Sequence, residues 1–244
     1  MMLIPFITAG YPTLDTFWKN LEELDQNGAD VIEIGVPFSD PVADGPVIEA
    51  ASLTALANGV TLRWILDGLL ARKGRFQAKL VLMGYLNPFL QYGFENLARD
   101  AQQAGIYGFI IPDLPLDEDA AYRLALKQHN IHLIALVAPN TSLERMQAYA
   151  KVASGYVYVI SVLGTTGVRQ GLPTDVAATL HRARQAFSLP LALGFGFSEP
   201  AQVEALPADQ RPDAIIFGSA LIRHLGEHRS AAEFMQPWKK MKAH

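Results

Sequence analysis

The sequence contains no cysteine among its 244 residues. Disulfide bonds, thiolate nucleophiles and thiolate metal sites are therefore excluded, and the absence fits a reducing compartment. Basic and acidic residues number 20 and 24, so the net charge is −4 and no polyanion-binding surface is indicated. No apolar run is long enough to span a bilayer. Residues 1–7 carry neither a basic region nor a small-residue cleavage site, so we expect no signal peptide and a cytoplasmic protein.

Apolar segments of strand length recur along the chain, with helical patterns between most of them. These segments are 3–7, 31–34, 80–83, 108–111, 132–137, 156–160, 189–193 and 214–217. Strands that alternate with helices predict a parallel sheet covered on both faces, and eight strands are the number that closes a barrel. We therefore expect a single (β/α)8 TIM-barrel domain over residues 1–244. An open doubly wound sheet is the alternative, but no Gly-x-Gly-x-x-Gly turn follows the first strand.

Several residues are typical of helix ends. Gly105 stands where a helix should stop. Thr141 and Glu144 have the spacing of a capping box, which predicts that Thr141 caps the next helix. Ser198 is expected to cap a later helix, with Pro200 in its first turn.

Two carboxyl groups stand out in the segment 32–45. Glu33 lies inside an apolar strand, and eleven residues later Asp44 ends a loop that is rich in proline and glycine. Burial raises the pKa of a carboxyl group, which suits a residue that both takes and gives a proton near pH 7. Asp44 is expected to stay ionised, so the two acids can divide the proton transfers. The alternative for Glu33 is a structural ion pair.

Other reactive side chains are scarce at the carboxyl ends of the strands, where barrels place their chemistry. Lys79 and His132 lie at the starts of strands, and every other lysine falls on a helix, a helix-end loop or the tail. A Schiff-base lysine, a histidine base and a His-rich metal site are therefore not expected. The remaining candidates are Asp40, Asp113, Tyr156 and Tyr158. The aspartates also suit turns or caps, and the tyrosines, which share one strand face, also suit the core.

Glycine-rich turns follow the last strands. They lie at 164–167, 194–196 and 218–219, and the last of them opens a helix. In barrels the turns after strands seven and eight, together with a helix N-terminus, commonly bind phosphate through backbone N–H groups. The sequence therefore predicts a phosphorylated substrate.

These residues resemble the tryptophan synthase alpha subunit family over nearly the whole chain. The matching segments are 8–12, 32–45, 82–88, 112–115, 138–140, 194–196 and 218–219. The resemblance implies a barrel that cleaves indole-3-glycerol phosphate into indole and glyceraldehyde 3-phosphate in tryptophan biosynthesis. It also implies that indole passes to a pyridoxal-phosphate beta subunit in an alpha-beta-beta-alpha complex. This chain itself is then expected to carry no cofactor or metal, and to bind neither nucleic acid nor a membrane.

The resemblance also implies roles for individual residues. Glu33 would protonate C3 of the indole ring, and Asp44 would stabilise the positive charge that develops on the ring. Tyr158 would lie beside the substrate, and Thr166 would help to position Asp44 when the loops 36–44 and 161–172 close. The phosphate would be held by Gly167, Phe195, Gly196, Gly218 and Ser219. The substrate pocket would include Leu82, Tyr85 and Asp113.

The chain departs from the family pattern in two places. A helix that plugs the barrel floor in many relatives is nearly absent, which we expect to affect stability more than activity. The turn at 164–167 reads Gly-Thr-Thr-Gly where many relatives have Gly-Val-Thr-Gly. Three alternatives remain at this stage. They are a stand-alone indole-releasing lyase, another phosphate-binding barrel enzyme such as an isomerase or epimerase, and a non-catalytic barrel that activates a beta subunit.

Overall fold

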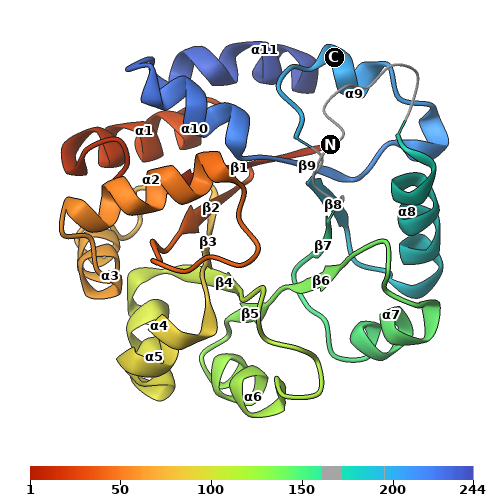
Figure 1. Cartoon of the computed structure of the whole chain (residues 1–244), viewed down its shortest axis with the longest axis horizontal. Helices are drawn as coiled ribbons and strands as arrows, with labels where there is room; N and C mark the ends of the chain where they lie inside the picture. The colour runs from red at the N-terminus through yellow and green to blue at the C-terminus, as the bar shows by residue number, and fades with distance from the viewer. Residues whose placement is uncertain (161–171, 195, 244) are drawn as a thin grey trace.

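The computed structural model describes residues 1–160, 172–194 and 196–243. Its strands pair in parallel in the order β5-β4-β3-β2-β1-β9-β8-β7-β6 (Figure 1). The strands are β1 (Met2–Thr8), β2 (Val31–Gly35), β3 (Lys79–Met83), β4 (Ile106–Ile110), β5 (His132–Leu133), β6 (Ala135–Val137), β7 (Val157–Ile160), β8 (Leu191–Gly194) and β9 (Ala214–Phe217). They agree with the predicted segments to within about two residues at each end.

The sheet closes on itself at one short segment. β5 pairs with β4 and β6 pairs with β7, and only Ile134 separates β5 from β6. The Ile134 N–H donates to the carbonyl oxygen of Phe109 at 2.9 Å. β5 and β6, the two end strands of this order, are therefore two halves of the single predicted strand 132–137. This closure confirms the (β/α)8 barrel, and the doubly wound alternative is wrong.

Helices surround the barrel (Figure 1). They are α1 (Leu14–Gln26), α2 (Pro46–Ala57), α3 (Leu62–Leu70), α4 (Leu86–Tyr92), α5 (Phe94–Ala104), α6 (Ala120–Gln128), α7 (Leu143–Ala150), α8 (Thr174–Ala186), α9 (Ala201–Glu204), α10 (Ser219–Gly226) and α11 (Ala231–Ala243). A short 3-10 helix, η1, covers Ala208–Gln210. Within the described ranges, none of these helices has the length and apolar character needed to cross a membrane.

The side chains of the strands form two layers. One layer lies between the sheet and the helices and includes Ile32 and Leu82. The other fills the barrel interior and includes Val81, with Met83 packed against it. Leu82 is fully buried in the outer layer, so its predicted place in the substrate pocket is wrong. Because strand side chains alternate, its neighbour Met83 points to the interior instead.

The helix-end predictions were partly correct. Gly105 ends α5 in the left-handed conformation, with φ at 80°. The α7 N-cap is Ser142, whose hydroxyl accepts a hydrogen bond from the Arg145 N–H at 3.2 Å. The Thr141 hydroxyl instead accepts from the Ala138 N–H at 2.9 Å, so the capping box predicted there is wrong by one residue. Ser198 does not cap α9, because Pro200 holds the N-cap position.

Candidate active site

Glu33 lies in the middle of β2, fully buried in the barrel interior. The hydroxyl of Tyr156, which directly precedes β7, donates a hydrogen bond of 2.7 Å to Glu33 Oε1. Within the described residues, Glu33 Oε2 has no hydrogen-bond partner and the carboxyl group has no cationic partner. The ion-pair alternative is therefore not supported. One carboxyl oxygen is fixed, and the other is available to a ligand in the barrel.

The surroundings of Glu33 change its acidity. Burial raises the pKa of Glu33 to about 8, and the hydrogen bond from Tyr156 opposes this rise because it stabilises the carboxylate. A carboxyl group with this pKa holds its proton at neutral pH and releases it at little cost, which is the property a general acid needs. The raised pKa predicted from the apolar strand is thus confirmed.

Asp44 lies half-buried at the end of the loop that follows β2. The Tyr85 hydroxyl accepts a hydrogen bond from the Ala43 N–H at 2.9 Å. Burial raises the pKa of Asp44, the nearby Tyr85 hydroxyl lowers it, and the nearby charge of Glu49 raises it. The net shift is upward, so the loop is less polar around Asp44 than its sequence suggests. Tyr85 fixes the backbone directly before Asp44 through the Ala43 N–H.

Tyr158 in β7 faces the same interior as Glu33. A Cβ atom added at Gly194 would come within 2.7 Å of the Tyr158 hydroxyl oxygen, so this ring lies against the backbone of β8. Burial raises the pKa of Tyr158, and the negative charges of Glu33 and Asp44 raise it further. The Tyr158 hydroxyl therefore keeps its proton and lies within electrostatic reach of both carboxyl groups.

The turns predicted to bind phosphate follow β8 and β9, which are neighbours in the sheet. Gly218 is the N-cap residue of α10, and Ser219 is the first residue of that helix. The first N–H groups of a helix lack partners within the helix and favour an anion. Gly196 has φ at +72°, and among the described residues no atom outside its immediate chain neighbours lies within 4 Å of the position its Cβ would take. The other residues predicted for this region lie outside the described residues; they are Thr166, Gly167 and Phe195.

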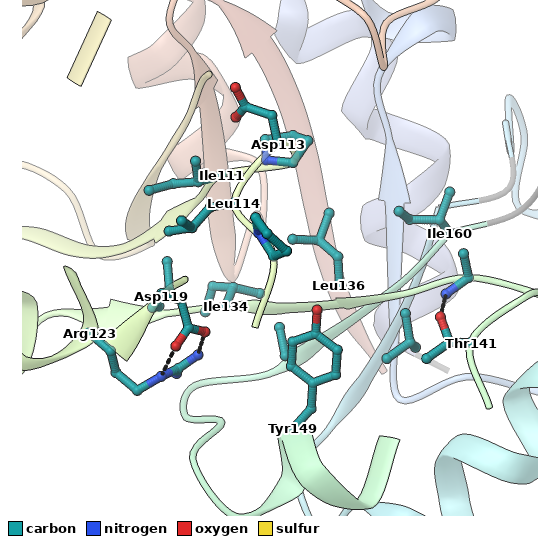
Figure 2. A pocket seen from close by; sticks show the side chains of 16 residues that line it. Ile111, Asp113, Leu114, Asp119, Arg123, Ile134, Leu136, Thr141, Tyr149 and Ile160 are labelled. Atoms are coloured by element: carbon teal, nitrogen blue, oxygen red, sulfur yellow. Dashed lines mark hydrogen bonds and ion pairs between the residues drawn. The ribbon is translucent and has the colours of Figure 1, made fainter. Parts of the chain in front are cut away.

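A cavity of about 440 Å³ lies beside β5 and β6 (Figure 2). Leu136 and Ile160 line it from the strand ends, and Tyr149 lines it from α7. Its volume is that of a small-molecule site. Pro112 lines this cavity and also a small pocket formed by Asp44, Met83 and Tyr85. The cavity therefore adjoins, at Pro112, the small pocket that Asp44 lines. The remaining residues of its wall include Ile111, Asp113, Leu114, Pro115, Asp119, Arg123, Leu133, Ile134 and Thr141.

The Asp113 carboxylate forms hydrogen bonds with the backbone of a neighbouring loop. Its Oδ1 and Oδ2 atoms accept hydrogen bonds from the Leu86 N–H at 2.9 and 3.2 Å. Leu86 is the first residue of α4, so Asp113 caps a helix that precedes it in the sequence by 27 positions. In Figure 2 its carboxylate points away from Tyr149 and from the Asp119–Arg123 ion pair.

Comparisons with known proteins agree with this geometry. The family model of the tryptophan synthase alpha chain matches residues 1–243. The tryptophan synthase alpha chain of Nitratidesulfovibrio vulgaris (strain Hildenborough) is 66% identical over 236 residues, which cover 97% of this chain and 91% of that protein. The chain belongs to the tryptophan synthase alpha chain family. Solved structures agree: tryptophan synthase from M. tuberculosis has a TM-score of 0.86 at 32% identity, covering 99% of this chain and 91% of that one. The alpha chain from Legionella pneumophila subsp. pneumophila has a TM-score of 0.85 at 32% identity, covering 99% and 90%.

Membership of the tryptophan synthase alpha chain family decides between the activities left open by the sequence. The chain is a carbon–carbon lyase that cleaves indole-3-glycerol phosphate in tryptophan biosynthesis. The isomerase or epimerase alternative and the non-catalytic alternative are therefore wrong. In the described part of the chain, no group of three or more His, Asp or Glu residues has the arrangement of a metal site.

The structure shows two contacts near Glu33 and Asp44 that sequence reasoning missed. Tyr156 was a candidate only by its strand face, and its contact with Glu33 joins residues 123 positions apart. Met83 lies beside Asp44 and Tyr85 in the small pocket, where Leu82 was expected. The alternation of side chains along β3 contained the signal for Met83, because Val81 is in register with Glu33.

Proposed function

We propose that Glu33 is the acid–base residue of the retro-aldol cleavage. The observation that carries this proposal is its complete burial, with a pKa of about 8 and one oxygen held by Tyr156. The protonated carboxyl group gives its proton to C3 of the indole ring. The resulting Glu33 carboxylate takes the proton of the substrate hydroxyl on the glycerol carbon that is attached to C3. The bond between that carbon and C3 then breaks, so that indole and an aldehyde form and Glu33 is protonated again.

Asp44 stabilises the positive charge that the ring carries after C3 is protonated. A carboxylate near the indole N–H favours that charge, because opposite charges attract strongly where water is excluded. Tyr85 supports this role because it accepts a hydrogen bond from the N–H of the preceding residue and lowers the pKa of Asp44, which favours the charged form. Tyr158 contributes a neutral hydroxyl beside the substrate.

The two ends of the substrate occupy different parts of the barrel. The phosphate binds to backbone N–H groups at Gly196, Gly218 and Ser219, where a helix N-terminus favours its charge. The apolar wall at Leu136 and Ile160 accepts the indole ring. By resemblance to the family we assign Gly167 and Phe195 to the phosphate site and Thr166 to the positioning of Asp44.

A pyridoxal-phosphate beta subunit is the proposed partner, in an alpha-beta-beta-alpha complex, and this chain carries no cofactor of its own. The loop between β2 and α2 supports this assignment, because Val42 is 84% exposed close to Asp44. An exposed apolar side chain next to the site suits a docked subunit that senses the loop. We also propose a cytoplasmic location, as expected for amino-acid biosynthesis.

We further propose that residues 1–244 act as one barrel domain, since β1 pairs with β9 from the other end of the chain. The test of the function uses the isolated full chain with indole-3-glycerol phosphate, and indole is measured over time. We expect the wild-type chain to release indole and the Asp44→Asn variant to release none. Unchanged release by Asp44→Asn would refute the assigned role. Release at full rate without any effect of a beta subunit would favour the stand-alone lyase.

A further inference from the structure

We infer that Asp113 is a positioning residue that holds Asp44 in place through α4 and Tyr85. The inference rests on the proposed function of Asp44. Asp113 follows β4, whereas Asp44 follows β2 and Tyr85 follows β3. β2, β3 and β4 are consecutive neighbours in the sheet, so the three loops meet at the same end of the barrel.

The first link joins Asp113 to α4. Both carboxylate oxygens of Asp113 accept from the Leu86 N–H, at 2.9 and 3.2 Å. The N-terminus of a helix has N–H groups without partners and a positive dipole end, so a carboxylate there stabilises the first turn. Tyr85, the N-cap residue, directs its hydroxyl to Ala43. The cap is therefore supplied by Asp113 from the next loop.

The second link joins α4 to the loop that carries Asp44. Tyr85 is adjacent to Leu86, and its ring is 5% exposed. Its hydroxyl accepts from the Ala43 N–H at 2.9 Å, directly before Asp44, and lies close enough to Asp44 to lower the pKa of that carboxyl group. Its ring also lies 5.3 Å from the ring of Phe38, at the other end of the same loop. A shift of the backbone at residues 85–86 would therefore displace the loop at both of its ends.

The two links form a chain from Asp113 to the charge-stabilising carboxylate. The negative charges of Asp44 and Asp113 both raise the pKa of Tyr85, as expected for groups that lie near one another. Direct contact with the substrate is the competing role for Asp113. The two roles differ in what they predict, because a direct contact acts without Tyr85 and a positioning contact acts only through it.

A double-mutant cycle with Asp113→Ala and Tyr85→Phe separates the two roles. We measure kcat and KM for indole-3-glycerol phosphate. Asp113→Ala is expected to lower kcat about tenfold with KM within about twofold, since small misplacements of a reacting group are costly. Tyr85→Phe is expected to lower kcat at least as much. The double variant should match Tyr85→Phe within about twofold, because residues that act as a unit are not additive.

Two further variants make the test specific. Asp113→Asn keeps an acceptor oxygen and should restore kcat to within about threefold of the wild type. Asp117→Ala, in the same loop, removes an exposed ion pair with Arg145 and should leave both constants unchanged. If Asp113→Ala melts below the assay temperature, the cycle is run with Asp113→Asn, whose smaller loss of kcat must likewise disappear in the Tyr85→Phe background.

The outcomes are distinguishable from those of the proposed function. Losses that multiply in the double variant, or a rise in KM with kcat unchanged, would overturn the positioning role and favour direct substrate contact. Unchanged activity in Tyr85→Phe would instead remove Tyr85 from the site, and with it both the proposed support of Asp44 and this inference. A loss in Asp113→Ala that vanishes in the Tyr85→Phe background supports the inference.

Discussion

The Tyr156 hydroxyl lies 2.7 Å from Glu33 Oε1 inside the barrel. This hydrogen bond fixes the orientation of the carboxyl group and leaves Oε2 as the oxygen that can exchange a proton, since no described residue binds it. The bond also favours the charged form of Glu33, against the effect of burial. Tyr156 therefore influences both the geometry and the acidity of the proposed catalytic group.

Glu33→Gln should abolish indole formation while the fold survives. The amide keeps the shape of the side chain but carries no transferable acidic proton, and a lost acid–base group costs about 10²–10⁴-fold in rate. Indole release and a circular-dichroism melt are measured together. Asp40→Asn is the control, because Asp40 is an exposed acid in the following loop. Substantial turnover by Glu33→Gln would contradict the assignment.

Tyr156→Phe should slow the reaction and move its pH profile. Without the hydroxyl the carboxylate loses a stabilising hydrogen bond, so the pKa of Glu33 rises above about 8. The alkaline limb of kcat/KM, which reports the free enzyme's acid, should move to higher pH. Tyr92→Phe is the matched control, because it loses a 2.7 Å hydrogen bond to Asp100 away from the site. If the alkaline limb of the kcat/KM profile stayed at the same pH, the ionisation of Glu33 would not be what determines it.

The stability of the protein should depend on the ionisation of Glu33. Its pKa rises from an ordinary value of 4.5 to about 8 in the folded state. The folded state therefore binds the proton more tightly, and this stabilisation is complete below about pH 4.5 and lost as the pH rises through about 8. Relative to wild type, Glu33→Gln should gain on the order of a few kcal/mol between these limits. Urea unfolding at several pH values measures the difference, and a constant difference would show that the Glu33 pKa is ordinary.

Gly196→Ala should weaken phosphate binding. Gly196 has a left-handed φ, and no described residue crowds the position of its Cβ, so a side chain there strains the turn and hinders close approach of the phosphate. We expect KM for substrate to rise about tenfold, which corresponds to about 1.4 kcal/mol. Gly74→Ala is the control, because Gly74 has φ at +80° and equally open surroundings far from the site. Calorimetry with glycerol phosphate and glycerol follows binding directly, and equal affinities would exclude a phosphate site.

A beta subunit should raise the lyase rate, and Pro41→Ala should reduce this activation more than the basal rate. Pro41 stiffens the loop that ends in Asp44, and a docked partner can favour one loop conformation with a few kcal/mol of differential binding. The measurement is a titration of the cognate beta subunit against indole release. A flat titration, with no complex in analytical ultracentrifugation, would indicate a stand-alone lyase.

Much of the fold was predictable because its signals are local. The apolar strand segments and the stop at Gly105 follow from neighbouring residues, and the structure has them within about two positions. Glu33 was predictable for a similar reason, since a carboxyl group in an apolar strand must be buried. The helix cap at Thr141 was not predicted correctly from local residues. The Thr141 hydroxyl accepts a hydrogen bond from the Ala138 N–H, and Ser142 caps the helix instead.

Contacts between distant segments were not predictable in this way. The bond between Tyr156 and Glu33 requires the barrel to close, and the cap of α4 by Asp113 requires two loops to meet. Neither contact joins residues at a regular spacing that could be recognised in a single sequence. The face of Leu82 depends on the register of β3 against β2, which sequence periodicity leaves open by one residue.

The interruption at Ile134 divides the barrel into two halves with different tasks. Glu33, Asp44 and Tyr85 belong to the half before it, whereas Tyr156 and the turns after β8 and β9 belong to the half after it. Neither half alone contains a complete site. A substrate anchored by its phosphate in one half and protonated by the other would span the two halves, so catalysis depends on their being joined, as they are where β1 pairs with β9.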